Sequence, residues 1–145
     1  MNELFENLKN NPSEDYESDI LEFKHYSSEK ALHNSKELPE EISALANSKG
    51  GNIIVGVKDS CNIKNSNWSE QLDGFERIDI NLVKERISGR LSPRYNIELE
   101  EIQFEEKNYL NISVPKSKNS LISTTSGKTF IRIGRSSTPA NPKEI

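Results

Sequence analysis

Hydrophobic side chains recur every three or four residues in three segments of the chain, and this spacing predicts three amphipathic helices. The segments are residues 2–9, a run that begins near Pro39 and continues to Ala46, and residues 78–91. Proline suits the first turn of a helix, and the neighbouring carboxylates Glu40 and Glu41 favour the positive end of its dipole. The second segment is therefore expected to start close to Pro39.

Other segments alternate hydrophobic and polar residues or are almost wholly apolar, which predicts strands. Residues 20–25 alternate, whereas residues 53–57 are nearly all hydrophobic and predict a central strand with both faces covered. Residues 97–104, 109–114 and 129–133 are three further strand candidates, with a hairpin turn expected at residues 105–108. The polar stretches 26–37 and 60–70 are predicted to be loops. This order indicates an α+β domain in which two main helices pack on a mixed β-sheet.

The composition narrows the class of protein further. A chain of 145 residues is about one domain, with residues 1–15 as an N-terminal helix and lead-in and residues 16–140 as the core. Only 32% of the residues are hydrophobic, so we expect a modest core and a surface partly covered by a partner subunit. The sequence has neither a membrane-spanning apolar run nor a signal peptide, and Cys61 is its single cysteine, which predicts a cytoplasmic protein.

The charges are distributed unevenly along the chain, although the net charge is only −4. Residues 3–22 contain seven carboxylates and one lysine, whereas the segment that begins at Lys107 is mainly basic. An acidic first part can hold a divalent cation, and a basic last part can contact phosphates. The alternative is that scattered charges simply keep a small domain in solution.

The glycine pair Gly50-Gly51 is not a nucleotide-binding loop. It follows a helix and precedes a strand, so no helix N-terminus points at a phosphate, and the P-loop spacing is absent. A tight turn is the better interpretation. His25, His33 and Cys61 also lack the spacing of a metal site, and the histidines are expected at the surface.

Three carboxylates, Glu17, Glu22 and Asp59, are the candidate catalytic and metal-binding residues. Carboxylate oxygens suit Mg²⁺ or Mn²⁺, and such an ion stabilises charge on a phosphodiester and activates an attacking water. Lys24 is expected on the same strand face as Glu22, where it can neutralise a phosphate oxygen. By spacing alone this signal is weak, because three carboxylates taken from the 23 in the chain would usually be ordinary surface charges.

Arg132 and Arg135 are the candidate nucleic-acid contacts in the last part of the chain. We expect Arg132 to point outward from the strand 129–133, with Arg135 just beyond Gly134. Two guanidinium groups beside hydroxyl side chains can hold a phosphate backbone without reading its sequence. A solvated edge strand is the alternative.

The chain resembles the Schlafen AlbA-like domain family, which in bacteria is also called a divergent AAA or putative DNA-binding domain. The resemblance depends on several motifs in order along nearly the whole chain: Glu22-Phe23-Lys24, residues 44–51, residues 53–59, residues 130–136 and Pro139-Ala140. Some Schlafen members are endoribonucleases that cut tRNA and rRNA at a three-carboxylate site with Mg²⁺ or Mn²⁺. Matched residue by residue, that site corresponds to Glu17, Glu22 and Asp59.

The resemblance implies a metal-dependent endoribonuclease for structured RNA, most plausibly tRNA, in the manner of a toxin or phage-defence effector. A non-catalytic DNA- or RNA-binding module of a transcriptional regulator is the alternative, and a dimerisation domain is a third hypothesis. Schlafen nuclease cores contain two such lobes around a basic groove, whereas this chain supplies one. A homodimer would replace the second lobe, or the chain could be a fragment of a larger protein.

Overall fold

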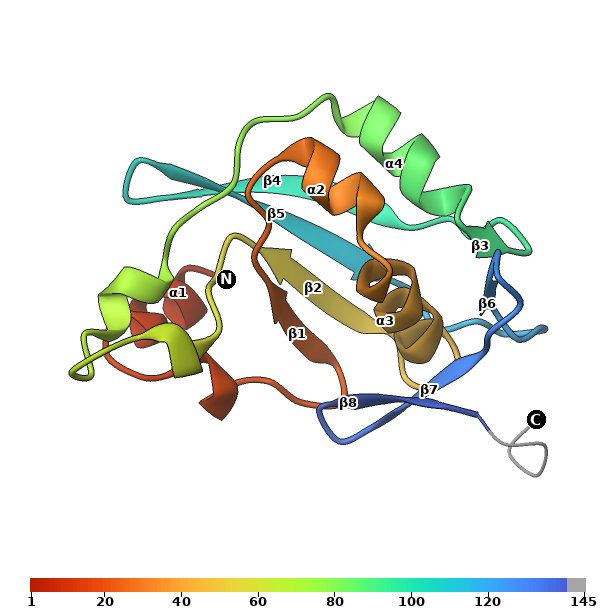
Figure 1. Cartoon of the computed structure of the whole chain (residues 1–145), viewed down its shortest axis with the longest axis horizontal. Helices are drawn as coiled ribbons and strands as arrows, with labels where there is room; N and C mark the ends of the chain where they lie inside the picture. The colour runs from red at the N-terminus through yellow and green to blue at the C-terminus, as the bar shows by residue number, and fades with distance from the viewer. Residues whose placement is uncertain (141–145) are drawn as a thin grey trace.

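A computed structural model describes residues 1–140, and a four-stranded mixed sheet forms its centre. The strands lie in the order β1, β2, β5 and β4, with bounds Leu21–Lys24, Gly51–Val55, Lys107–Val114 and Glu98–Phe104. Strands β1 and β2 are parallel, and the other neighbouring pairs are antiparallel (Figure 1). The predicted α+β class with a mixed sheet is confirmed.

Both faces of the sheet are covered by helices. Helices α2, α3 and α4 lie on one face, and the short helix α1 lies on the other (Figure 1). Their bounds are Asn2–Leu8 for α1, Glu29–Asn34 for α2, Glu37–Ala46 for α3 and Ile80–Ser88 for α4. In β2, Ile53 and Val55 join the core beneath α3, whereas Ile54 packs on the α1 side. This alternation explains why the strand is almost wholly apolar.

Helix α2 corrects the predicted loop at residues 26–37. Leu32 is its one fully buried side chain, so its sequence has almost no hydrophobic periodicity. The hydroxyl of Ser28 accepts a hydrogen bond from the N–H of Ala31 at 3.2 Å and caps the first turn. The predicted loop at residues 60–70 is likewise interrupted by two short 3₁₀ helices, η2 (Ser60–Asn62) and η3 (Trp68–Gln71).

Two small sheets pack around helix α3. Strand β3 (Leu91–Ser92) pairs with β6 (Ser123–Thr124), and β7 (Phe130–Ile133) pairs with β8 (Ser136–Pro139). The side-chain amide of Asn47, at the end of α3, donates to the carbonyls of Ile122 at 2.8 Å and Phe130 at 2.9 Å. The predicted strand at residues 129–133 therefore exists, but it lies outside the main sheet.

The turn at Gly50-Gly51 brings β1 and β2 together. Gly50 has a φ of +75°, and a Cβ atom on Gly51 would lie 2.3 Å from the carbonyl oxygen of Ile20, so only glycine allows this approach. The predicted tight turn is confirmed. Across residues 1–140, no helix has the length and apolar character needed to cross a membrane.

Candidate functional site

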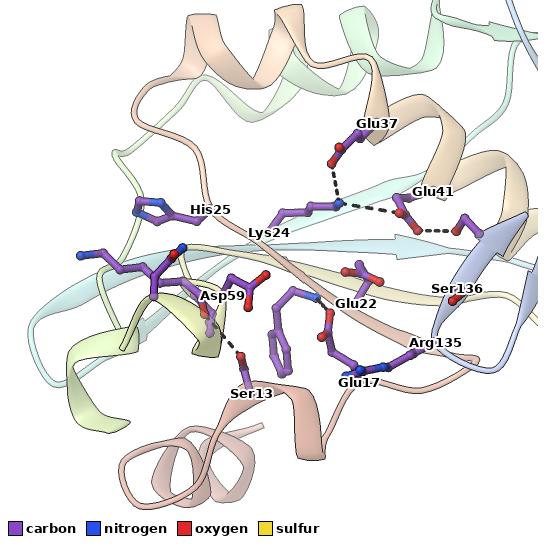
Figure 2. Close-up of a pocket in the computed structure, with 15 residues that line it drawn as sticks. Ser13, Glu17, Glu22, Lys24, His25, Glu37, Glu41, Asp59, Arg135 and Ser136 are labelled. Atoms are coloured by element: carbon purple, nitrogen blue, oxygen red, sulfur yellow. Dashed lines mark hydrogen bonds and ion pairs between the residues drawn. The ribbon is translucent and has the colours of Figure 1, made fainter. Parts of the chain in front are cut away.

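A cleft of about 800 Å³ lies where β1 and β2 end. It is lined by five of the six candidate residues, namely Glu17, Glu22, Lys24, Asp59 and Arg135 (Figure 2). Its other walls come from the first turn of α3, the segment before η2 and the start of β8. Residues far apart in the sequence therefore share one concave surface.

The parallel pairing of β1 with β2 explains this convergence. Glu22 lies opposite Ile53 and Lys24 lies opposite Val55, so both strands deliver their next residues to the same end of the sheet. Asp59 follows β2 at this end. A second link fixes the segment before β1: the hydroxyl of Ser13 donates to the carbonyl of Lys58 at 3.3 Å, and its N–H donates to the side chain of Gln71 at 2.9 Å.

Glu22 is the most perturbed acid in the cleft. Burial raises the pKa of its carboxyl to about 7, and the neighbouring carboxyl of Glu17 adds to this rise, while Arg132 opposes it. Glu17 is itself held in place, because one of its oxygens accepts a hydrogen bond from the N–H of Phe23 at 3.4 Å. A negative charge on Glu22 is therefore disfavoured, and its carboxyl is mainly protonated below about pH 7.

Lys24 lies between acidic side chains from helix α3. Its ammonium nitrogen is 3.0 Å from Glu37 and 3.6 Å from Glu41 (Figure 2). Burial alone would lower the pKa of Lys24, but the charges of Glu41, Glu37 and Glu22 outweigh that effect and raise it. Lys24 therefore stays protonated and provides a fixed positive charge in the wall of the cleft.

Asp59 is oriented by a backbone N–H two residues further along the chain. Its carboxylate accepts a hydrogen bond from the N–H of Cys61 at 3.0 Å and so caps η2. This hydrogen bond lowers the pKa of Asp59, and the carboxylate stays ionised in the cleft.

Arg132 does not point outward, and the expectation that it is a surface residue is wrong. Its side chain is 0% exposed, and its terminal nitrogens lie 2.7 Å from Glu22 and 2.7 Å from Glu41. It also donates to the backbone carbonyl of Ser18 at 2.8 Å. Strand β7 pairs with β8 beside α3 and does not join the main sheet. The side chains of β7 alternate between its two faces, and this alternation places Arg132 underneath the cleft.

Arg135 lies at the rim of the cleft. Its side chain is 54% exposed, and within residues 1–140 its one ion pair, of 3.7 Å, is with the exposed Glu14. Such a pair is weak, and the role of Arg135 as a nucleic-acid contact stays a prediction.

Sequence reasoning missed several residues of the cleft. Glu37 was expected in a loop and Glu41 only near the start of a helix. Both belong to α3, where their spacing of four residues places them on one helix face. His25 lines the cleft as well, and its Nε2 atom lies 2.7 Å from Asp73. No pattern in the sequence connects His25 with Asp73, because their contact depends on the loop after β2.

The side chains of the cleft have the oxygen atoms that a divalent cation prefers, but they are not all arranged around one point. Burial and the neighbouring Glu17 raise the pKa of Glu22, so a cation could take the place of its proton, and oxygen donors suit Mg²⁺ or Mn²⁺. However, the described residues contain no group of three acidic, histidine or cysteine ligands gathered around one point. Glu17 and Glu22 therefore fit such an ion, whereas Asp59, engaged with Cys61, does not join them in this conformation.

Two solved structures share the fold. The DIP2311 protein from Corynebacterium diphtheriae aligns with a TM-score of 0.65 at 21% identity, over 85% of this chain and 25% of that chain. The N-terminal domain of a putative ATP-dependent DNA helicase RecG-related protein from Nitrosomonas europaea aligns with a TM-score of 0.59 at 22% identity, over 93% of this chain and 89% of that domain. This chain therefore spans about a quarter of the first protein and most of the N-terminal domain of the second.

The family comparison covers most of the chain. No curated protein matches it at a significant level. The family described as Schlafen, AlbA_2 matches residues 17–141, a range that includes every candidate residue of the cleft. The chain belongs to the Schlafen AlbA_2 family.

Proposed function

We propose that the chain is a metal-dependent endoribonuclease that cuts structured RNA, with tRNA as the favoured substrate. The observation that carries this proposal is the convergence of Glu17, Glu22 and Asp59 on one cleft that also holds Lys24 and Arg135. Carboxylates beside fixed positive charges are the groups that metal-assisted phosphodiester hydrolysis needs.

Each residue has a defined part in this proposal. Glu17 and Glu22 would hold Mg²⁺ or Mn²⁺ once Glu22 has released its proton, and Asp59 would complete the set by giving up its bond to Cys61. The ion would stabilise charge on the phosphate and lower the pKa of a bound water. Lys24 supplies a fixed positive charge toward a phosphate oxygen, and Arg135 contacts the RNA backbone at the rim. Arg132 orients Glu22 and does not contact RNA.

The charge of the cleft supports a cation in this role. Five carboxylates and three lysine or arginine side chains line it: Glu17, Glu22, Glu37, Glu41 and Asp59 against Lys24, Lys58 and Arg135. A polyanion would be repelled from a net acidic cleft unless a divalent ion first reversed part of that charge. Homodimerisation, which would supply a second lobe, is part of the same proposal.

A non-catalytic DNA- or RNA-binding module is the second candidate. The hydrogen bond from the N–H of Cys61 to Asp59 favours this candidate, because in this conformation the described residues do not bring three metal ligands together. The similar domain from Nitrosomonas europaea comes from a protein described as DNA helicase-related, which makes DNA the ligand to compare with RNA. This candidate predicts salt-sensitive binding and no cleavage with any metal ion.

The decisive experiment incubates purified protein with tRNA and Mn²⁺ and compares wild type with Glu17→Gln, Glu22→Gln and Asp59→Asn. Loss of a residue that merely supports a metal ligand costs about 10–100-fold, so loss of a direct ligand is expected to slow cleavage by at least about 100-fold. Glu100→Gln is the matched control, because Glu100 is an exposed carboxylate on β4 outside the cleft.

The outcome separates the two candidates. Cleavage by wild type and Glu100→Gln but not by the three cleft variants supports the nuclease. Equal cleavage by all variants removes these carboxylates from the mechanism, and binding without cleavage in any metal favours the second candidate.

A further inference from the structure

We propose that a second hollow, behind the first turn of α3, binds backbone phosphates of a polynucleotide. This hollow measures about 320 Å³ and is lined by Lys36, Pro39, Glu40, Arg90, Thr124, Thr125, Ser126 and Lys128. Nothing in the family match or in the similar structures assigns a role to it. The inference deepens the proposed function and depends on it for the choice of RNA as the polynucleotide.

The charge of this hollow is opposite to that of the catalytic cleft. Three basic side chains, Lys36, Arg90 and Lys128, face a single carboxylate, Glu40. Within residues 1–140, none of the three basic groups has an ion-pair partner at 4.0 Å or less. A phosphate that is repelled by the acidic cleft is therefore attracted here, where the local charge is positive.

Arg90 is held ready for an anion. One terminal nitrogen donates to the backbone carbonyls of His33 at 2.7 Å and Ser35 at 2.5 Å. Its own carbonyl accepts from the N–H of Thr125 at 3.0 Å, which joins α4 to the β6 turn. These contacts fix the guanidinium plane, so little side-chain entropy remains to be lost when the other N–H groups bind phosphate oxygens.

A tight turn presents hydroxyl groups beside Lys128. The N–H of Thr124 donates to the carbonyl of Lys128 at 2.8 Å, and Gly127 closes the turn with a φ of +87°. The hydroxyls of Thr124 and Ser126 are 2.8 Å apart, so the two groups are held next to each other. Hydroxyl donors next to lysine and arginine are the groups that commonly contact the phosphate backbone of a nucleic acid.

The two hollows share a wall. Lys36 lines the second hollow, and the adjacent residue, Glu37, lines the catalytic cleft. Helix α3 contacts both β6 and β8, and Figure 1 shows β6 beside the helix and β8 below it. One polynucleotide that crosses the first turn of α3 can therefore contact both hollows. The second hollow would anchor the RNA while its scissile phosphate lies in the cleft.

The test measures binding without cleavage. A fluorescently labelled tRNA, the favoured substrate of the proposed function, is titrated with protein in EDTA. The double variant Lys36→Glu/Lys128→Glu is compared with Lys116→Glu/Lys118→Glu, which makes the same change of charge at exposed residues outside both hollows. Circular dichroism and thermal melting confirm that both variants are folded.

We expect Lys36→Glu/Lys128→Glu to weaken RNA binding at least about 10-fold and to reduce the salt slope of log Kd by about 0.7 for each lost contact. The control pair should change affinity less than about 3-fold. Equal weakening by both pairs, or no weakening by either, would overturn the inference. Equal competition by polyglutamate would also overturn it, because the hollow would then bind carboxylates in place of phosphates.

This experiment is separate from the test of the nuclease. If wild type does not cut RNA with Mn²⁺ but binds it through Lys36 and Lys128, the proposed catalysis fails and this inference stands. If cleavage occurs and both lysine pairs bind RNA alike, the inference fails and the nuclease stands.

Discussion

Arg132 connects the floor of the cleft to the edge of the sheet. Its guanidinium binds Glu22 and Glu41 and also donates to the carbonyls of Ser18 at 2.8 Å and Leu21 at 3.4 Å. The carbonyl of Leu21 belongs to strand β1 and also accepts from the N–H of Ser18 at 3.0 Å, so the arginine is a second donor to this backbone group. One side chain thereby positions an acid of the cleft and contacts the strand that carries it.

Replacing Arg132 should therefore damage the fold, whereas replacing Arg135 should not. Arg132→Gln leaves Glu22 and Glu41 without their buried positive partner, and breaking a buried pair in this way costs about 3–5 kcal/mol. We expect the free energy of unfolding, measured by urea titration, to fall by that amount. Arg135→Gln is the control, because its pair with Glu14 is exposed. Equal stability of the two variants would contradict the buried role of Arg132.

The β4–β5 hairpin is the element with the clearest local strain. Its two turn residues, Glu105 and Glu106, have φ angles of 47° and 69° and connect the paired residues Phe104 and Lys107. Two-residue hairpin turns with positive φ at both positions favour asparagine and glycine, and glutamate pays a cost there. Glu105 forms an ion pair with Lys9 at 2.6 Å, which offsets part of this cost. Within the described chain Glu106 has no ion pair, so nothing offsets its cost in this way.

Glu106→Gly should stabilise the protein. Removing the side chain from a left-handed position gains about 1 kcal/mol, since that conformation costs a non-glycine residue roughly 1–2 kcal/mol. Urea unfolding measures the change, and Glu100→Gly within strand β4 is the control, because glycine in a strand interior is destabilising. A loss of stability in Glu106→Gly would show that the turn is not strained.

The elements differ in how clearly the sequence predicts them. Strand β2 could be predicted because both of its faces are buried and its residues are uniformly apolar. Helix α2 could not, because Leu32 is its single fully buried residue and its cap, Ser28, resembles any other serine of a polar stretch. Motifs recognised through the family were sufficient to predict that Glu17, Glu22, Lys24 and Asp59 lie near one another, and all four line one cleft, whereas their roles stay a prediction. The placement of Arg132 and Glu41 depends on how β7 packs against α3, which no local pattern encodes.

At the scale of the whole molecule, the stability should depend on pH through Glu22. Its pKa is about 7 in the folded protein and 4.5 in the unfolded chain, so the folded state holds this proton more tightly. The contribution of Glu22 to the free energy of unfolding is therefore greatest below about pH 4.5 and is lost as the pH rises through about 7. The loss amounts to about 3 kcal/mol at most.

Glu22→Gln should abolish this decrease, because the amide keeps a hydrogen-bond acceptor for Arg132 and has no proton to lose. The measurement is the free energy of unfolding from about pH 5 to about pH 8 in wild type and variant. Adding Mn²⁺ at the higher pH should stabilise wild type more than Glu22→Gln, since the ion replaces the lost proton. Parallel pH profiles for the two proteins would contradict the assignment to Glu22.

The position of β4 at the end of the sheet has a consequence for self-association. Glu98, Glu100 and Glu101 lie along this strand. If two copies extended their sheets by joining β4 to β4 about a two-fold axis, these glutamates would be brought close to those of the other copy. Like charges facing each other across paired strands are destabilising, and charged edge strands resist such joining. We therefore expect a two-fold dimer of this chain to leave the two β4 strands apart and to form through another surface.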